Sequence, residues 1–179
     1  LQWIQDFLFE RKQRVVFKGA VSDWCSVTSG VPQGSVLGPI FFVLFVNDIN
    51  DIVSSPIFQF ADDHTILRPI LNDSDHDVLQ NDIHNIFQWT TLNKLPLNLS
   101  KCSVMHMTRS KSPNHCDTYI MGDSRLNEVN TFKLLGVTFS KDLSFDSHID
   151  AISSKVSKLS GFIIRCTRNM SSFALLNLY

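Results

Sequence analysis

The stretch Gln59-Phe60-Ala61-Asp62-Asp63-His64-Thr65 places two adjacent aspartates between the apolar runs Pro56-Ile57-Phe58 and Ile66-Leu67. Apolar or β-branched residues on both sides of a short polar pair predict two strands joined by a tight turn. Such a turn presents two carboxylates at the tip of a hairpin. Carboxylate oxygens suit Mg²⁺, which takes one or two protein carboxylates together with substrate phosphates. Adjacent aspartates are also common solvated turn residues, so this stretch alone leaves both interpretations open.

The composition is that of an ordinary globular chain. Of its 179 residues, 44% are hydrophobic and 18% are charged, which suffices for one core. The longest apolar run, from Pro39 to Val46, is far shorter than the roughly 18–20 residues of a membrane span, so no membrane partner is expected. The chain opens Leu-Gln-Trp without Met or a basic leader, so we expect an intracellular segment of a longer protein.

Charge is distributed unevenly around a net value of −1. Residues 1–100 carry 6 Lys or Arg against 11 Asp or Glu, and residues 101–179 carry 10 against 6. An acidic half followed by a basic half is compatible with a metal site beside a phosphate-binding element, and equally with chance. The cysteines have no Cys-x-x-Cys spacing, so reduced thiols are expected rather than a zinc site. The four cysteines are Cys25, Cys102, Cys116 and Cys166.

The first thirty residues predict a helix over 3–10 and strands over 13–17 and 24–28, with a turn at Lys18-Gly19. Basic residues gather in and beside the first of these strands. This cluster is either a nucleic-acid contact or a solvated strand edge, because charge on an edge also deters aggregation. Its members are Arg11, Lys12, Arg14 and Lys18.

Residues 29–39, Ser-Gly-Val-Pro-Gln-Gly-Ser-Val-Leu-Gly-Pro, predict an irregular loop, since three glycines and two prolines do not fit regular structure. Pro39 suits the first turn of a helix. Residues 40–46 are apolar on every side, which predicts a helix buried all round. The loop therefore leads into a helix N-terminus, where backbone N–H groups can meet a phosphate or a base. A tight turn before a core helix is the alternative.

Downstream, Asn72-Asp73-Ser74-Asp75 offers capping side chains for a helix that we expect to end at about Asn93. Three strands are predicted over 102–108, 117–121 and 131–140. From Ser144 the pattern changes to a long amphipathic helix, whose basic face is either a phosphate contact or simply the solvated side. Its apolar stripe is Ile149, Ile152, Val156, Leu159 and Ile163, and its basic residues are Lys155, Lys158, Arg165 and Arg168.

Three motifs occur in one order: the loop at 29–39, Phe60-Ala-Asp-Asp63, and Asn98-Leu-Ser-Lys101 before a strand. In this combination the chain resembles the reverse transcriptase of a non-long-terminal-repeat (LINE-like, jockey-like) retrotransposon. The resemblance implies an α+β fold. Its polymerase palm, an antiparallel sheet packed on helices with primer-grip-like strands, would cover residues 1–140. The start of a helical thumb would cover residues 141–179.

The same resemblance implies an RNA-directed DNA polymerase that uses Mg²⁺, or alternatively Mn²⁺. A primer 3′-hydroxyl would attack the α-phosphate of a deoxynucleoside triphosphate opposite an RNA template, and the family's action in DNA integration leads us to expect a nuclear protein. By the match of motifs, Asp62 and Asp63 are the catalytic carboxylates and metal ligands. The residues expected to contact nucleotide or template are Gly30, Pro32, Gln33, Gly34, Phe60 and Lys101. The residues expected to contact the primer are Leu135 and Gly136.

The sequence departs from the family in one important respect. Polymerases of this type take a third aspartate from an earlier palm strand, and none of Asp6, Asp23 or Asp48 has the right context to replace it. We therefore expect an inactive palm-and-thumb fragment of an active parent. The competing hypothesis is a non-catalytic relic that binds nucleic acid or protein. A metal-dependent hydrolase using the two aspartates and His64 is disfavoured, because the sequence offers no convincing further ligands.

Overall fold

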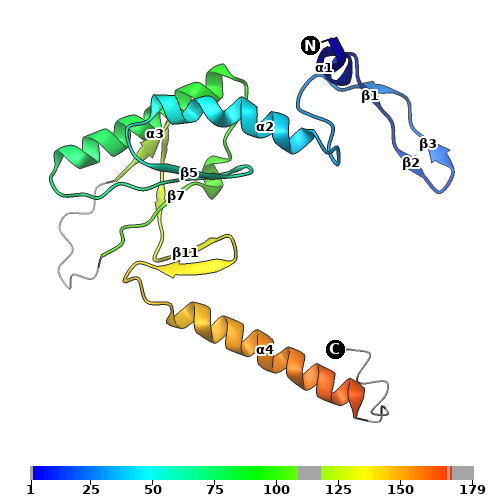
Figure 1. The fold of residues 1–179 in the computed structure, drawn as a ribbon. Helices are drawn as coiled ribbons and strands as arrows, with labels where there is room; N and C mark the ends of the chain where they lie inside the picture. Colours follow the sequence, from blue (N-terminus) through cyan, green and yellow to red (C-terminus); the bar gives the residue numbers. More distant parts are fainter. Residues whose placement is uncertain (1, 109–117, 169, 171–179) are drawn as a thin grey trace. The chain divides into compact units, whose positions relative to one another are not determined.

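The computed structural model describes residues 2–108, 118–168 and 170. The chain divides into two compact units, Leu1–Leu95 and Pro96–Tyr179 (Figure 1). Helices and short sheets alternate, in agreement with the expected α+β class. The helices are α1 (Gln2–Leu8), α2 (Gly38–Val46), α3 (Ser74–Leu92) and α4 (Asp146–Thr167), with 3₁₀ turns η1 (Asn47–Ile52) and η2 (Leu99–Lys101).

The described strands pair two by two. Antiparallel pairs are formed by β1 (Lys12–Gln13) with β4 (Cys25–Ser26), β2 (Val16–Phe17) with β3 (Ala20–Val21), β5 (Ile57–Phe60) with β6 (Asp63–Ile66), β8 (Ile120–Met121) with β9 (Ser124–Arg125), and β11 (Thr131–Leu134) with β12 (Val137–Ser140). One pair, β7 (Ser103–Val104) with β10 (Asn127–Glu128), is parallel. The single antiparallel sheet that the resemblance implies is not assembled among these described strands.

The first unit begins with a two-stranded ribbon from β1 to β4. Lys18 and Gly19 both have positive φ, 48° and 86°, as in the type I′ turns that connect hairpins, so the predicted turn is confirmed. Both predicted strands are interrupted. On one side of the ribbon two residues separate Gln13 from Val16, and on the opposite side three residues separate Val21 from Cys25. This mismatch is a β-bulge, which breaks the ladder into two short parts.

Helix α3 is the centre of the first unit. Its apolar residues Ile83 and Ile86 are buried, and Val46 and Ile49 from the preceding segment are buried as well. The helix ends at Leu92 with Asn93 as its C-cap, where the sequence predicted its end. This helix therefore supplies the apolar surface against which the chain between α2 and β5 is held.

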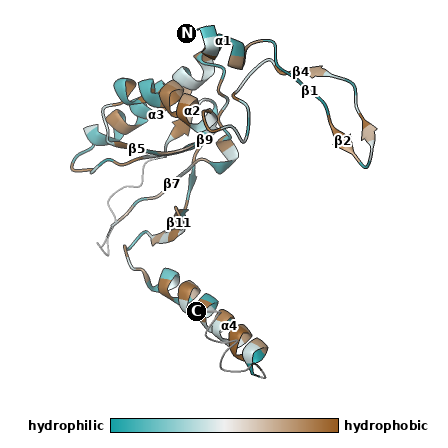
Figure 2. Cartoon of the chain, turned by 45° about the vertical axis from the view of Figure 1, so that its right-hand side comes forward, coloured by the Kyte–Doolittle hydropathy of each residue, from teal (hydrophilic) through white to brown (hydrophobic). Residues whose placement is uncertain are grey.

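Helix α2 is not buried all round, and that prediction was wrong. Among its residues only Gly38 and Val46 are buried, although Figure 2 shows the helix as strongly hydrophobic. Its contacts lie at two aromatic residues: Phe41 meets Phe7 of α1 at 5.9 Å between ring centroids, and Phe45 meets Trp89 of α3 at 5.8 Å. Composition alone suggested burial on every side, but these contacts cover only part of the helix. The large side chains left exposed are Ile40, Val43, Leu44 and Phe45.

Asp82 on α3 fixes the chain just before β5. Its carboxylate is only 1% exposed and accepts hydrogen bonds from the backbone N–H groups of Ser54 and Ser55, at 2.7 and 2.9 Å. Asn85, one turn later, donates to the carbonyl of Ile52 at 3.0 Å. A buried carboxylate needs such partners, because an unpaired one would carry a large desolvation cost. The start of the hairpin is thus bound to the side of α3.

The Asp82 contacts form a first clamp on the hairpin, and a second clamp holds the chain just after β6. Arg68, two residues after β6, donates from Nε and Nη2 to Oδ1 of Asp75 in the first turn of α3, at 3.2 and 2.9 Å. Its Nη1 also donates to the Ser55 hydroxyl at 3.3 Å. The other carboxylate oxygen of Asp75 accepts from the N–H groups of Leu71 and Asn72. The backbone before α3 is therefore held by Asp75, whereas the side chain at the N-cap position, Asp73, makes no capping hydrogen bond.

The second unit has its own small core, formed by Tyr119, Met121 and Leu126. The segment 131–140, predicted as one strand, is a hairpin whose two-residue turn is Leu135-Gly136, with φ of 49° and 89°. That prediction was wrong, because the glycine in the run permits a type I′ turn and a reversal of the chain. The predicted strand at 102–108 is reduced to β7, and part of the one at 117–121 lies outside the described residues.

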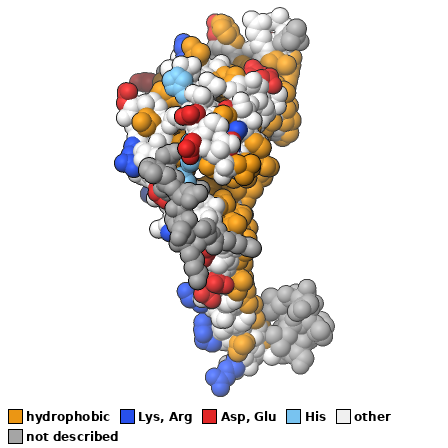
Figure 3. Space-filling view, turned by 90° about the vertical axis from the view of Figure 1, so that its left-hand side faces the viewer, with side chains coloured by type: hydrophobic (Ala, Val, Ile, Leu, Met, Phe, Trp, Pro, Cys, Tyr) orange, Lys and Arg blue, Asp and Glu red, His pale blue; other side chains and the backbone are white. Residues whose placement is uncertain are grey.

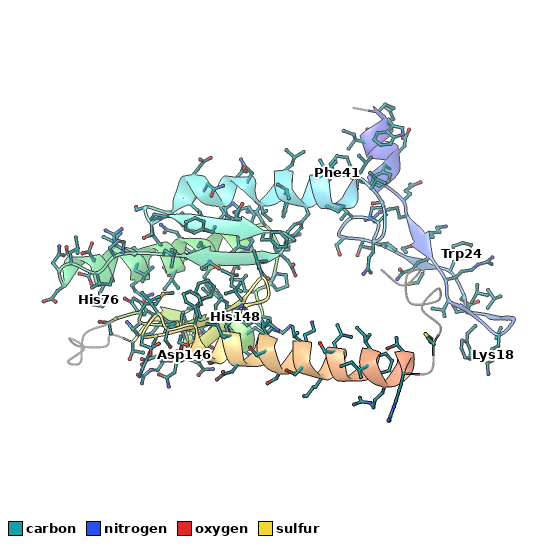
Figure 4. The ribbon with its side chains drawn as sticks, turned by 60° about the horizontal axis from the view of Figure 1, so that its bottom comes forward. Lys18, Trp24, Phe41, His76, Asp146 and His148 are labelled. Carbon is teal, nitrogen blue, oxygen red and sulfur yellow. The ribbon has the colours of Figure 1, made fainter. Side chains whose placement is uncertain are left out.

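The predicted C-terminal helix is confirmed as α4. At its start, His148 Nδ1 accepts the backbone N–H of Thr138 at 3.3 Å, and Phe145 meets Phe139 edge-on at 5.9 Å (Figure 4). Farther along, the whole predicted apolar stripe from Ile149 to Ile163 is exposed. Figure 3 shows Lys and Arg side chains along one side of this helix and hydrophobic side chains along another. The described helices include none that is long and apolar enough to cross a membrane.

The Asp82 clamp predicts a specific loss of stability. Asp82→Asn keeps one acceptor oxygen but turns an NH₂ group toward the second serine amide, so the free energy of unfolding should fall by about 1–3 kcal/mol. Urea unfolding followed by circular dichroism measures this loss. Asp77→Asn, on the exposed face of the same helix, is the matched control and should cost less than about 1 kcal/mol. Equal losses in the two variants would contradict the clamp.

Asp75 predicts an acid-dependent part of the stability. The Leu71 amide, and after it the Arg68 guanidinium, hold the pKa of Asp75 below its ordinary value. Because the pKa is lower in the folded chain, the stabilisation is complete above the ordinary carboxyl pKa of about 3.9 and is lost as the pH falls through the folded value. Unfolding free energies of the wild type and Asp75→Asn should therefore converge in acid. A constant difference across this range would refute the assignment.

Candidate functional site

The two aspartates of the central stretch lie at the tip of the β5–β6 hairpin, as predicted. Phe60 pairs with Asp63, so the turn consists of only two residues, Ala61 and Asp62. Ala61 has φ of 52°, in the left-handed region that few residues other than glycine adopt. In this tight connection Asp62 is the second turn residue, and Asp63 is the first residue of β6. Both aspartates are exposed.

The tip is chemically suited to a hard cation. Two neighbouring carboxylates supply oxygen ligands, and the donor set fits Mg²⁺ sites that use one or two carboxylates plus substrate phosphates. His64 Nδ1 lies 3.2 Å from the carbonyl oxygen of Asp62, so this nitrogen donates its proton and the imidazole supports the turn. Within the described ranges, no group of three or more His, Cys, Asp or Glu residues gathers as a metal site. The two aspartates would thus form part of a ligand set.

The loop before α2 is held together by Ser35 and Gly38. The Ser35 hydroxyl donates to the Pro32 carbonyl at 2.7 Å and accepts the N–H of Gly38 at 3.0 Å, which satisfies one free donor at the start of the helix. A Cβ on Gly38 would lie 2.9 Å from the Ser35 hydroxyl oxygen and 3.1 Å from the Pro32 carbonyl. The loop therefore folds back onto a glycine that no other residue can replace without displacement. Within it, Gln33 is exposed.

Arg11 anchors the start of this loop. Its guanidinium Nη2 donates to the carbonyls of Ser29 and Gly30, and its Nε donates to the carbonyl of Leu8 at the end of α1. The sequence left the basic cluster as either a nucleic-acid contact or a solvated strand edge. Arg11 is neither, since its guanidinium binds the backbone of the loop. The next residues of the cluster, Lys12 and Arg14, remain exposed.

The predicted site residues fall into separate groups. Phe60, Asp62 and Asp63 share one hairpin, and Gln59 of this hairpin donates to the carbonyl of Val46 at the end of α2, at 3.4 Å. A second group, Gly30, Pro32, Gln33 and Gly34, shares the loop that opens α2, with Gly30 and Gly34 at φ of 70° and 82°.

The remaining predicted residues belong to the second unit. Lys101 is exposed at the end of η2, and Leu135 and Gly136 form the exposed turn between β11 and β12. Each of these positions offers a side chain or backbone group to solvent. These residues belong to Pro96–Tyr179, whereas the aspartates belong to Leu1–Leu95.

Sequence reasoning missed the residues that support the site. Asp82 carried a detectable signal, because it interrupts the apolar stripe between Leu79 and Ile83 at helical spacing, where a charge requires partners. Ser35 and Gly38 were part of the noted motif, but their mutual contact could not be read from it. The pairing of Arg68 with Asp75 left no signal, since both are ordinary charged residues near a predicted turn.

Comparison with known proteins identifies the family. The profile of the family described as "Reverse transcriptase (RNA-dependent DNA polymerase)" matches residues 1–139, which is most of the chain. The chain belongs to the reverse transcriptase family.

Reverse transcriptases of mobile elements are among its relatives. The chain is 28% identical over 175 residues to the RNA-directed DNA polymerase from mobile element jockey of Drosophila melanogaster, and 28% identical over 160 residues to that of Drosophila funebris. It is 26% identical over 162 residues to the probable RNA-directed DNA polymerase from transposon X-element of Drosophila melanogaster. These matches cover 89%, 84% and 86% of this chain but only 19%, 17% and 17% of the relatives, so the chain spans about a fifth of their length. No solved structure matches it significantly.

Two glycines give a matched test of the loop in this reverse transcriptase. Gly38→Ala should be destabilising, by about 1–3 kcal/mol, because the added methyl meets the Ser35 hydroxyl and the Pro32 carbonyl. Gly161→Ala, inside α4, meets only the far end of the Arg165 side chain at 3.4 Å and should stabilise the helix by about 0.5–1 kcal/mol. Thermal unfolding of both variants measures these opposite signs. A stabilised Gly38→Ala variant would refute the packed loop.

Proposed function

We propose that this chain is the part of an RNA-directed DNA polymerase of a non-long-terminal-repeat retrotransposon that carries the paired catalytic aspartates. The reaction would be metal-dependent nucleotidyl transfer, in which a primer 3′-hydroxyl attacks the α-phosphate of a deoxynucleoside triphosphate and pyrophosphate leaves. The observation that carries the proposal is the position of Asp62 and Asp63, both exposed at a two-residue hairpin tip in a chain of this family.

The support for this chemistry is the position in which the chain holds Asp62 and Asp63. Phosphoryl transfer depends mainly on alignment of the reacting groups and neutralisation of charge. Bound Mg²⁺, or Mn²⁺, would polarise the phosphate oxygens and lower the pKa of the attacking hydroxyl. Asp62 and Asp63 would hold the metal, while the clamps at Asp82 and Arg68 keep the base of their hairpin against α3. The protein thus contributes carboxylates whose place is fixed by bonds at the opposite end of the hairpin.

The other predicted residues would position the nucleic acids. Gly30 and Gly34, with positive φ, allow the backbone of the loop to come close to a base pair. The exposed Gln33 amide can donate and accept hydrogen bonds toward nucleotide or template. By the same family resemblance, Phe60 beside the aspartates would contact nucleotide or template, and Lys101 after η2 would contact the triphosphate.

We assign the remaining elements by the same logic. Residues 1–140 would form the palm and residues 141–179 the start of the thumb. The turn at Leu135-Gly136 would touch the primer, and the basic side of α4 would follow the phosphate backbone of the duplex. A third aspartate, as the family resemblance implies, would complete the metal site of a parent polymerase that acts in the nucleus.

Primer extension on an RNA template tests the proposal. In a full-length polymerase containing this segment, Asp62→Asn should lower the rate of DNA synthesis at least about 100–1,000-fold, because a ligand of the metal that would neutralise the transition-state charge is lost. The isolated 179-residue chain should give no synthesis. The control is the double variant Asp48→Asn/Asp51→Asn, which removes two exposed carboxylates from η1. It should leave the rate of the full-length polymerase nearly unchanged.

Metal binding by the isolated chain gives a second readout. Broadening of amide NMR signals by Mn²⁺ should concentrate at residues 61–64 and disappear in Asp62→Asn/Asp63→Asn. Retained synthesis by Asp62→Asn in the full-length polymerase would refute the catalytic assignment, and robust synthesis by the isolated chain would refute its incompleteness.

A further inference from the structure

The ribbon from β1 to β4 presents a face that combines positive charge with exposed apolar and aromatic side chains. Lys12, Arg14 and Val16 lie at alternate positions of the segment that runs from β1 into β2, and the extra residue of the bulge is on the opposite segment. Alternate positions of an extended segment share one side of the ribbon. The Arg14 guanidinium lies over the Trp24 ring, 4.6 Å from its centroid, which brings Trp24 to this side as well. Val21 is opposite Val16 in the register and shares the face. We call these five residues the ribbon face.

Every member of the ribbon face is exposed. Trp24 is 60% exposed, and the flanking valines are more than half exposed. Figure 4 labels Trp24 and Lys18 on this ribbon. Lys18 at the turn lies over the ring of Phe17, 5.5 Å from its centroid, and Phe17 follows Val16 in β2, so this pair lies on the other side of the ribbon. Exposed aromatic and cationic groups that touch one another on a narrow ribbon form a surface suited to a ligand that is both flat and anionic.

The charge of the ribbon differs from that of its surroundings. Residues 12–26 carry three basic side chains, Lys12, Arg14 and Lys18, against one acidic side chain, Asp23. The whole segment 1–100 has 6 basic and 11 acidic side chains, so the remainder outside the ribbon is strongly acidic. A polyanion is therefore attracted to the ribbon and repelled by much of the rest of this segment.

The pair of Arg14 and Trp24 fits a single strand of nucleic acid better than a duplex. Unpaired bases expose flat surfaces that stack on aromatic side chains, whereas in a duplex these surfaces are covered. The guanidinium covers one part of the indole and keeps its N–H groups available for phosphate oxygens. A protein partner would have to be acidic to match this excess of positive charge, whereas a single strand of nucleic acid is anionic along its whole length and also supplies flat bases for Trp24.

We propose that the ribbon face binds single-stranded nucleic acid, with Trp24 stacking on a base and Lys12 and Arg14 pairing with phosphates. The inference rests on the proposed function for the source of the strand, which would be the unpaired template. Binding at the ribbon requires neither the paired aspartates nor a metal. Its failure can therefore be distinguished from failure of the polymerase chemistry.

The test is fluorescence anisotropy of a fluorescein-labelled oligouridine with the 179-residue chain in EDTA. Trp24→Ala and Arg14→Gln should each weaken binding about 5-fold or more, the scale of one lost base stack. Arg14→Gln should also reduce the slope of log affinity against log salt by about 0.7, as expected for one phosphate contact on a single strand.

The controls match the variants in exposure and charge. Trp3→Ala removes a tryptophan that is also 60% exposed, and Lys141→Gln removes an exposed lysine of the second unit; both should leave the affinity within about 2-fold of wild type. Photocrosslinking with 4-thiouridine should place adducts within residues 12–26. Unfolding midpoints of all variants should equal that of the wild type, because the substituted side chains are exposed.

Three results would overturn the proposal. The first is equal loss of binding in Trp3→Ala and Trp24→Ala. The second is a preference for duplex over the single strand, with crosslinks only in α4. The third is a concentration-dependent dimer, detected by sedimentation, that Trp24→Ala dissociates while oligouridine binding is unchanged, since the ribbon face would then contact a second copy of this chain.

Discussion

The hydrogen bonds from the backbone amides of Ser54 and Ser55 to the buried carboxylate of Asp82 determine where the central hairpin begins. A two-stranded hairpin is at best marginally stable in water without a surface to hold it. Helix α3 provides that surface through two residues. Asp82 binds the chain just before β5, and Asp75 pairs with Arg68 just after β6. Both polar clamps lie at the base, and at the tip His64 contacts the Asp62 carbonyl while both aspartates stay exposed.

The same division between a bonded base and an exposed end recurs in the loop before α2. Arg11 holds its start, and Ser35 with Gly38 closes its end, while Gln33 between them stays exposed. Under the proposed function this division would be useful, because phosphoryl transfer requires groups held in position with little covalent participation by the protein. Family membership and these two exposed groups support one another, since each is drawn from a different property of the chain.

Local patterns were enough to predict the Asp62-Asp63 hairpin, the turn at Lys18-Gly19 and the long helices, because turn chemistry and helical periodicity depend on near neighbours. The exposure of α2 could not be predicted, since burial depends on which elements cover a face. Asp82 and its serine amides are 27 and 28 residues apart, so only the folded chain reveals their contact. The turn at Gly136 was missed because the apolar residues around it fit a continuous strand.

Native-state hydrogen exchange of Asp82→Asn tests most directly whether α3 holds the hairpin in place. Exchange should accelerate at the hydrogen-bonded amides of β5 and β6, because the base of the hairpin is released. The amides of the β11–β12 hairpin in the second unit should exchange as in the wild type. Unchanged protection in β5 and β6, with the variant folded, would contradict the claim that Asp82 positions the aspartates.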